Sequence, residues 1–203
     1  MAISTYSELR TAVENWLDHA LFTSRVPEFI ALFEATANRR LRVREQEATG
    51  IIATTSGAGT LPTDYLSWRS VLSIASDVST DLEYVTPSYL TALYPTSPSG
   101  SPRHFTIRGT TLHIRPVPTT ESIALLYFQK IPALSDSATT NWLLTAHPDL
   151  YLFGSLVEAE MFGVNDERGG LWKGRVEEIF NEIEKLSNKT RGAGTIKVMS
   201  VTP

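Results

Sequence analysis

The first part of the chain has the hydrophobic spacing of two helices. One apolar stripe recurs every three or four residues: Leu9, Val13, Trp16, Leu17 and Leu21. This spacing predicts a helix over residues 5–22, and Thr5-Tyr6-Ser7-Glu8 has the pattern of a capping box at its start. A second stripe predicts a helix over residues 24–44, with Pro27 in the first turn, where a missing N–H costs least.

Residues 49–138 lose this periodicity, and short β-branched or aromatic runs alternate with Ser, Thr, Gly and Pro. The pattern predicts a β region. Its clearest unit is a hairpin over residues 104–115 with a two-residue turn at Gly109-Thr110. In that register Ile107 opposes Leu112 and Phe105 opposes Ile114, which leaves a polar opposite face.

Other strands are predicted at residues 68–74, 82–85 and 123–128. The run 123–128 is apolar on both faces, which suits a central strand. Residues 94–102 contain three prolines and a glycine and are predicted to form a surface loop.

Helical spacing returns after Trp142. A helix over residues 149–163 is apolar on nearly every side, which is typical of a helix packed by several neighbours. Asn165-Asp166-Glu167 then precedes a long helix whose predicted seam is Trp172, Val176, Ile179, Phe180, Ile183 and Leu186.

Two helices on each side of a β region predict an α+β fold. We expect an antiparallel four-helix bundle core with an inserted small antiparallel β subdomain and an extended C-terminal tail. The predicted segments are 1–48 and 141–189 for the two halves of the bundle, 49–140 for the β subdomain and 190–203 for the tail. In the tail, Arg191-Gly192-Ala193-Gly194 precedes an alternating run that suits a strand added to the edge of another sheet: Ile196, Lys197, Val198, Met199 and Val201.

Composition narrows the class of protein. Of 203 residues, 42% are hydrophobic, enough for a sizeable core, and the absence of cysteine removes disulfides, zinc-thiolate sites and cysteine nucleophiles. No secretory signal and no long apolar run is present, so we expect a soluble, unsecreted protein without a membrane segment. Lys and Arg number 18 against 22 Asp and Glu, a net charge of −4, which disfavours tight non-specific DNA binding.

The search for an active site is negative. The phosphate-binding, dinucleotide-binding, metalloprotease and serine-hydrolase motifs are all missing, so we expect no enzyme activity, cofactor or metal. The candidate interface residues are basic and lie in two groups: Arg39, Arg40, Arg42 and Arg44 late in the second helix, and His104, Arg108, His113 and Arg115 on the polar face of the hairpin. Cations at a helix C-terminus are also favoured by the helix dipole, so a purely structural role for the first group stays open.

Several short motifs follow one another in a fixed order. They are Tyr6, Leu9, Arg10, Trp16 and Leu17; Pro27, Phe29, Ile30, Glu34 and Arg39-Arg40-Leu41-Arg42; Leu61-Pro62-Thr63-Asp64-Tyr65-Leu66 with Arg69; Thr86-Pro87; Ile107, Gly109, Leu112 and Pro116; Lys130-Ile131-Pro132-Ala133-Leu134; Asn141-Trp142-Leu143-Leu144; Pro148-Asp149-Leu150-Tyr151-Leu152-Phe153-Gly154; and Asn165-Asp166-Glu167-Arg168 with Trp172. Over residues 6–186 this order resembles the head-to-tail adaptor (connector) proteins of tailed bacteriophages.

The resemblance implies a virion structural protein without catalytic residues. Such a protein forms a dodecameric ring beneath the portal protein, extends the DNA channel and presents a platform to the tail or nozzle protein. It implies a place in the virion neck, after assembly in the host cytoplasm, with viral DNA passing without sequence-specific contacts. The tail from Ile196 to Val201 is then expected to dock on the portal, and the two basic groups to contact ring neighbours or partners.

Two alternatives stay open at this point. One is a monomeric, tail-associated module that binds carbohydrate or protein through its β region. The other is a nucleic-acid-binding protein that uses the arginines, which a steep salt dependence of DNA affinity would support.

Overall fold

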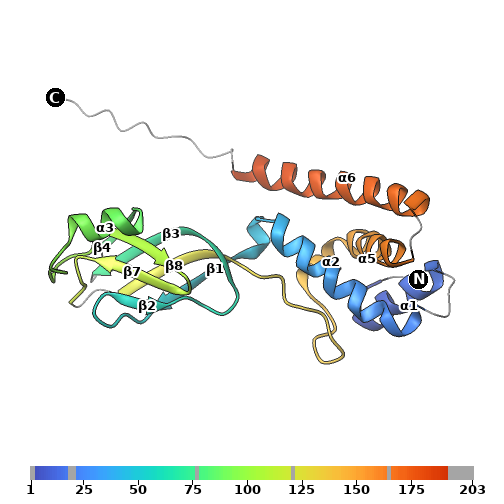
Figure 1. Ribbon diagram of the computed structural model, residues 1–203, viewed down its shortest axis with the longest axis horizontal. Helices are drawn as coiled ribbons and strands as arrows, with labels where there is room; N and C mark the ends of the chain where they lie inside the picture. Colours follow the sequence, from blue (N-terminus) through green and yellow to red (C-terminus); the bar gives the residue numbers. More distant parts are fainter. Residues whose placement is uncertain (1–2, 18–21, 76–77, 120–121, 164–165, 192–203) are drawn as a thin grey trace. The chain divides into compact units, whose positions relative to one another are not determined.

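The computed structural model describes residues 3–17, 22–75, 78–119, 122–163 and 166–191 of the chain (Figure 1). Within these ranges the fold is α+β, as expected, with six α-helices and two four-stranded sheets. The chain divides into two compact units, which we call the helical unit (residues 1–45 and 131–203) and the β unit (residues 46–130). Each unit has its own cluster of buried hydrophobic residues.

The helical unit contains five helices: α1 (Tyr6–Leu17), α2 (Val26–Arg40), α4 (Trp142–Ala146), α5 (Pro148–Phe162) and α6 (Asp166–Arg191). The short 3-10 helices η1 (Thr23–Arg25) and η2 (Arg44–Gln46) flank α2. The predicted capping box is confirmed at α1, where Thr5 N–H donates to Glu8 Oε2 at 3.0 Å and Glu8 N–H donates to Thr5 Oγ1 at 3.3 Å.

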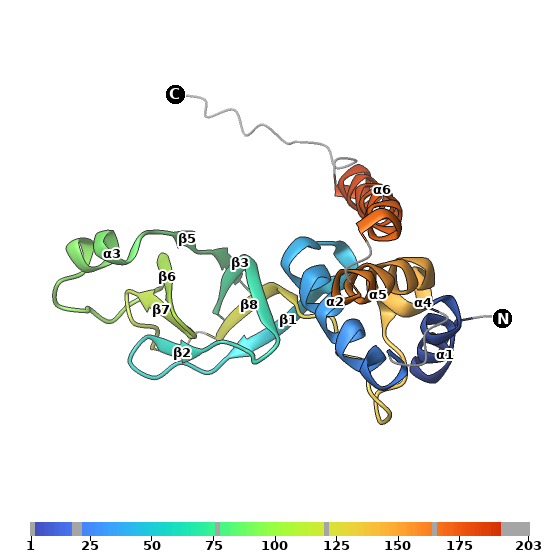
Figure 2. The same cartoon turned by 45° about the vertical axis from the view of Figure 1, so that its right-hand side comes forward.

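The prediction of a four-helix bundle core is wrong. Helix α5 lies at the centre and packs against α1, α2, α4 and α6, whereas α1 and α2 have little contact with each other. Figures 1 and 2 show α6 beside α5, and the two helices are in contact. The reason is the sequence of α5 itself: an apolar surface on nearly every side is buried only when neighbours surround it, and two antiparallel pairs would leave part of it exposed.

Two further details differ from the prediction: the residue at which α2 ends, and the buried face of α6 near its end. Helix α2 ends at Arg40 rather than at residue 44, because Leu41 takes an extended conformation (φ −73°, ψ 134°) while its N–H still bonds to Ala37 O. In α6, Val176, Ile179, Phe180 and Ile183 are buried as expected. Leu186 is 67% exposed, and the inward position of that turn is instead the buried Ser187.

The β unit contains eight strands: β1 (Glu47–Ile52), β2 (Ala58–Thr60), β3 (Tyr65–Ala75), β4 (Val78–Asp81), β5 (Glu83–Tyr84), β6 (His104–Arg108), β7 (Thr111–Arg115) and β8 (Ser122–Gln129). One sheet has the order β1-β8-β3-β4 and the other β2-β7-β6-β5. Their facing side chains form one core that includes Val71, Phe105, Leu112, Ile114 and Leu125.

The predicted hairpin is confirmed in detail. Ile107 pairs with Leu112 and Phe105 with Ile114, and Gly109 takes the positive φ of 59° that its turn position requires. Strand β8 is central, between β1 and β3, as its two-sided apolar pattern predicts.

Two features of the β unit correct the expectation of a small, wholly antiparallel insertion. Strands β5 and β6 pair in parallel. In addition, the helix α3 (Pro87–Leu93), capped by the Thr86 side chain, packs on β6. As a result Thr106, which alternation places on the polar face of the hairpin, is fully buried.

Candidate interaction surfaces

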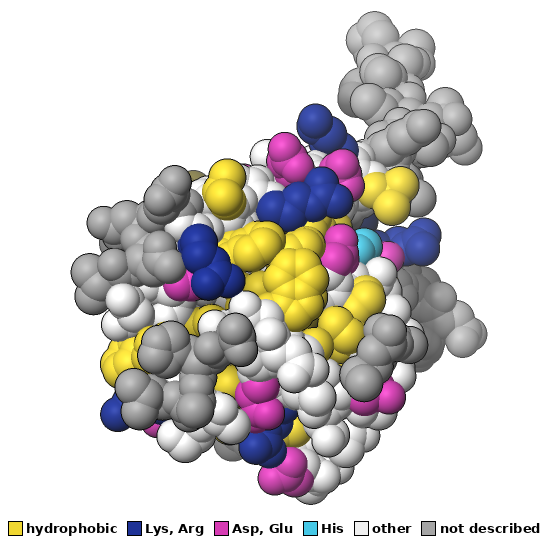
Figure 3. Space-filling model, turned by 90° about the vertical axis from the view of Figure 1, so that its right-hand side faces the viewer, with side chains coloured by type: hydrophobic (Ala, Val, Ile, Leu, Met, Phe, Trp, Pro, Cys, Tyr) yellow, Lys and Arg dark blue, Asp and Glu magenta, His cyan; other side chains and the backbone are white. Residues whose placement is uncertain are grey.

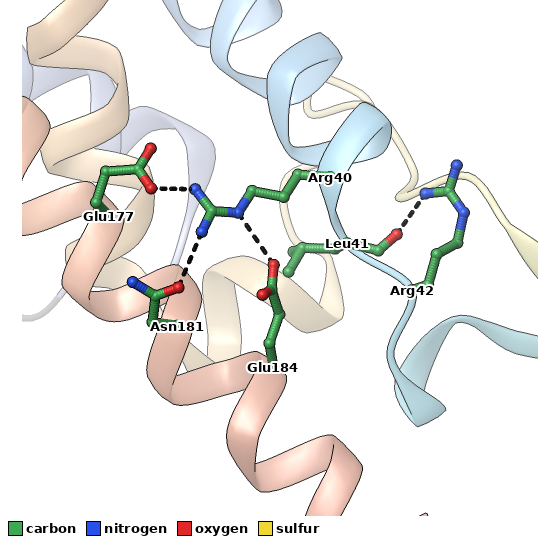
Figure 4. A network of polar contacts seen from close by, with 6 residues as sticks. All are labelled: Arg40, Leu41, Arg42, Glu177, Asn181 and Glu184. Carbon is green, nitrogen blue, oxygen red and sulfur yellow. Dashed lines mark hydrogen bonds and ion pairs between the residues drawn. The ribbon is translucent and has the colours of Figure 1, made fainter.

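The arginines at the end of α2 have partners inside the helical unit. Arg40 reaches α6, where its Nη1 lies 2.5 Å from Glu177 Oε2, its Nε 3.0 Å from Glu184 Oε1 and its Nη2 3.2 Å from Asn181 Oδ1 (Figure 4). The same guanidinium lies 4.5 Å from the centre of the Phe180 ring. We call this set of contacts the Arg40 clamp. It fixes two successive turns of α6, from Glu177 to Glu184, to the end of α2.

Arg42 completes the end of α2. Its Nη1 donates to Asn38 O at 2.8 Å and to Leu41 O at 2.5 Å, so its charge lies at the negative end of the helix dipole (Figure 4). For Arg40 and Arg42 the structure therefore supplies intramolecular roles. Arg39 and Arg44 are exposed and remain the accessible members of this group.

A buried polar network joins α2, α5 and the segment that returns from the β unit. Glu34 Oε1 accepts from Leu134 N–H at 2.9 Å and from the Tyr151 hydroxyl at 3.0 Å. The Asn141 amide donates to the Tyr151 hydroxyl at 2.6 Å and to Pro132 O at 2.7 Å, while its oxygen caps α4. Burial raises the pKa of Glu34, and the two donated bonds partly offset that effect.

On the β unit, the outer face of the hairpin holds α3 in place. Arg108 Nη2 donates to Pro87 O at 3.0 Å and to Thr91 Oγ1 at 3.1 Å. At the other end of β6, the Tyr94 hydroxyl and His104 Nδ1 are 2.7 Å apart. His104 and Arg108 are four residues apart on one strand and so point to the same side, one at each end of α3.

Arg108 also lines a pocket of about 220 Å³ together with His113 and Arg115. The opposite wall comes from α3 and the following turn: Leu90, Thr91, Tyr94, Pro95 and Ser97. Burial lowers the pKa of His113, and the neighbouring charges of Arg108 and Arg115 lower it further. Of the eight predicted interface residues, the structure thus brings these three together.

Exposed aromatic side chains occur on both units. In the helical unit Trp16 is 45% exposed and packs edge-on against Phe153 and Trp172, which stack on each other. On the side of the helical unit that faces the viewer in Figure 3, hydrophobic side chains gather between acidic and basic ones. In the β unit Trp68 stacks on Tyr84 with ring centres 5.6 Å apart, and both are exposed. Such aromatic surfaces favour contact with other proteins.

Nothing in the described ranges has the make-up of a metal centre or a membrane span. No group of three or more His, Asp or Glu side chains converges there. No helix in those ranges is long and apolar enough to cross a bilayer.

A family model described as SU10 adaptor protein matches residues 4–198, nearly the whole chain. The chain belongs to this family. These are phage head–tail adaptors, and the assignment confirms the resemblance found in the sequence. A search of curated proteins finds no match to the chain.

Membership gives the adaptor a structural role in the phage virion neck, with the portal and tail proteins as interaction partners. The predicted docking tail, Ile196 to Val201, lies outside the described residues. Sequence reasoning missed the wall that α3 and Tyr94 form over the hairpin. The sequence carries a signal for α3 in Thr86-Pro87, a helix cap followed by a first-turn proline, and the predicted loop over residues 94–102 begins only after this helix.

Proposed function

We propose that this adaptor forms a ring beneath the portal, extends the DNA channel and provides the attachment platform for the tail. The observation that carries the proposal is the family match over residues 4–198, because it spans both units rather than one.

The distribution of exposed hydrophobic residues supports a ring. A closed ring of identical subunits needs two different surfaces that complement each other. The helical unit exposes Trp16 and Leu171, and the β unit exposes Trp68, Tyr84 and Tyr89. The two surfaces consist of different residues on different units, and a head-to-tail contact likewise joins two unlike surfaces.

The charge of the chain supports a channel that lets DNA slide. Affinity for DNA grows with the number of phosphates that Lys and Arg neutralise. The adaptor carries a net charge of −4, and Arg40 and Arg42 are already bonded within the helical unit. Viral DNA is therefore expected to pass without tight or sequence-specific contacts.

The last residues are proposed to dock on the portal. Residues 196–201 have the alternating pattern of a strand that adds to the edge of another sheet. The residues of this pattern are Ile196, Lys197, Val198, Met199 and Val201. Helix α6 ends at Arg191, a few residues before this segment in the sequence, and the Arg40 clamp fixes α6 to α2. The segment thus starts from an anchored helix.

Native mass spectrometry of the purified adaptor, alone and with its cognate portal, tests the proposed ring. We expect either a closed oligomer or a defined increment in the portal's mass equal to a fixed number of 22.5 kDa subunits. An unrelated phage's portal is the control. A monomer that leaves the cognate portal unchanged contradicts the proposal and favours a monomeric tail-associated binding module.

A deletion of residues 192–203 tests the docking segment. We expect the shortened adaptor to keep its thermal unfolding midpoint while losing most of its binding to the portal. The double substitution Ile196→Ser with Val198→Ser should act in the same direction, and Thr202→Ser is the matched control. Undiminished co-assembly of the deletion variant would remove the segment from the interface.

A further inference from the structure

The pocket under α3 is lined by two arginines and a histidine on one side and by uncharged residues on the other. His113 and Arg115 lie two residues apart on β7 and therefore point to the same face, and Arg108 joins them from the end of β6. None of the residues that line the pocket is acidic. The nearby Glu83 pairs with His104, 3.7 Å from its Nε2.

Both guanidinium groups keep donors free for a ligand. The hydrogen bonds of Arg108 use Nη2, and those of Arg115 to the carbonyls of Ser56, Gly57 and Ile114 use Nη1. A guanidinium carries five N–H donors, so these contacts leave several of them unoccupied. They also hold each side chain in place, and a held arginine loses little entropy when it binds a ligand.

We propose that this pocket is a docking site for the carboxylate side chain of a partner protein, held by Arg108 and Arg115. The inference rests on the proposed function for the source of the carboxylate, a neighbouring protein of the virion neck. The two oxygens of a planar carboxylate match the forked N–H donors of a guanidinium group. The hydrogen bonds between the two groups are strong because both partners are charged.

Size and lining favour a single protein side chain over nucleic acid. A pocket of about 220 Å³ admits one small anionic group, and Leu90 and Pro95 give one wall an apolar surface that suits the methylenes of Asp or Glu. DNA binding instead needs a series of cations along the phosphate backbone. The net charge of −4 works against that mode.

His113 supplies a reporter for the pocket. The groups that face it are Arg108 from β6, Arg115 from β7 and the Tyr94 side of the pocket. A bound carboxylate offsets the two positive charges that lower the pKa of His113, so the pKa should rise towards its ordinary value of 6.5 on binding. By linkage, the affinity for a carboxylate should increase as pH falls through that pKa.

The experiment titrates the full-length adaptor with a blocked Gly-Glu-Gly peptide while the His113 imidazole and arginine side-chain resonances are followed by NMR. The blocked Gly-Gln-Gly peptide is the uncharged control. We expect saturable shifts with the Glu peptide only. Arg108→Gln should weaken binding by about tenfold or more, because it removes a charge-assisted pair.

Arg103→Gln is the matched control variant, since Arg103 is exposed, lies outside the pocket and carries the same charge. Arg115→Gln is a second variant. Arg115 also bonds to backbone carbonyls, so Arg115→Gln could weaken binding by destabilising the fold. The thermal unfolding midpoint of this variant is therefore compared with that of Arg108→Gln, which removes only the contacts to Pro87 and Thr91. The site is supported if both variants lower the affinity for the Glu peptide by a similar factor.

Three results would overturn the inference. The Gln peptide could bind as well as the Glu peptide, Arg103→Gln could weaken binding as much as Arg108→Gln, or inorganic phosphate or a short DNA duplex could bind through Arg108 while the Glu peptide does not. These readouts use the adaptor alone. A failure of ring or portal assembly in the mass measurement therefore leaves the pocket result standing, and the two proposals fail separately.

Discussion

Gly154 shows how one residue can set the distance between two helices. It lies in α5, buried against the ring of Phe33 on α2. A methyl group at this position would come within 2.0 Å of Phe33 Cδ2, closer than van der Waals contact permits. Phe33 itself contacts the rings of Tyr151 and Phe180, which limit how far its ring can move aside.

Gly154→Ala is therefore expected to lower the free energy of unfolding by about 1–3 kcal/mol through overpacking, despite the better helix propensity of alanine. Gly174→Ala is the control, because no atom lies within 4 Å of the added methyl group on α6. That variant should gain about 0.5–1 kcal/mol. Urea denaturation of both proteins measures the two changes, and a stabilised Gly154→Ala variant would contradict the close approach.

Glu34 makes the stability of the helical unit depend on pH. Its pKa is raised above the ordinary 4.5, mainly by burial, so the folded protein holds the proton more tightly than the unfolded chain does. The contribution of protonated Glu34 to the free energy of unfolding is fully present below pH 4.5. It is lost as the pH rises through the pKa that Glu34 has in the folded protein.

Glu34→Gln keeps an oxygen for Leu134 N–H and for the Tyr151 hydroxyl but cannot ionise. We expect the free energy of unfolding of the wild type, relative to this variant, to decrease between pH 4.5 and neutral pH. Glu182→Gln, at an exposed position of α6, is the control and should show no such trend. A wild-type curve parallel to that of Glu34→Gln over this range would exclude the effect.

At the scale of elements, α6 depends on a few polar contacts. It packs on α5 through one buried stripe, and its other sides are exposed. The Arg40 clamp adds contacts with two carboxylates, one amide and one aromatic ring from two successive turns of α6. A guanidinium shared by several partners holds a helix more firmly than separate surface ion pairs do.

Arg40→Ala should destabilise the helical unit by about 1–2 kcal/mol, and Arg40→Lys by most of that amount, because lysine cannot reproduce the fork. Hydrogen exchange should speed up most at Asn181 and its neighbours in α6. Arg175→Ala, which removes only the exposed pair with Glu178, is expected to cost less than about 0.5 kcal/mol. Equal exchange rates in the Ala variants of Arg40 and Arg175 would mean that the clamp does not hold α6.

Elements with a strong local pattern could be predicted from the sequence. The hairpin over 104–115 follows from alternation and a glycine turn, and both are local properties. The short helices α3 and α4 have too few turns for a periodic apolar stripe. Only their N-cap residues, Thr86 and Asn141, indicate a helix in the sequence. The arrangement around α5 depends on contacts far apart in sequence, such as Glu34 with Tyr151, which no local pattern contains.

The interface residues illustrate the same limit. Alternation placed Arg108, His113 and Arg115 on one face, and the structure brings them into one pocket. The partners of Arg40 on α6 are more than a hundred residues away, so its role could not be read from the run of arginines around it. Local sequence identified a basic surface but could not say which charges are satisfied within the molecule.

At the scale of the whole molecule, two units are joined by two crossings of the chain. Both crossings lie at paired strands: Glu47 on β1 pairs with Phe128 on β8. Just outside that pair, Gln46 Nε2 lies 3.4 Å from Gln129 O, and Lys130 N–H donates to Asp64 O at 2.7 Å. The ends of the β unit are therefore tied to the unit itself, and its core is built from its own residues.

A fragment of residues 46–130 is accordingly expected to fold alone and to unfold cooperatively, with a free energy of unfolding of about 4–10 kcal/mol.

A fragment with the boundaries expected from the sequence, residues 49–140, is the comparison. It lacks the buried Gln46, the ion pair between Glu47 and Arg69, and the first pairs of β1 with β8. It adds residues 131–140, in which the N–H groups of Ile131 and Leu134 donate to Asn38 and Glu34 of the helical unit. We expect it to unfold at least about 1–2 kcal/mol more easily, because β1 loses its first rungs and Gln129 loses a partner. Urea denaturation and the dispersion of NMR signals decide between the two. If 49–140 proves the more stable fragment, the strand ends do not close the β unit, and the segment 131–140 belongs to its fold.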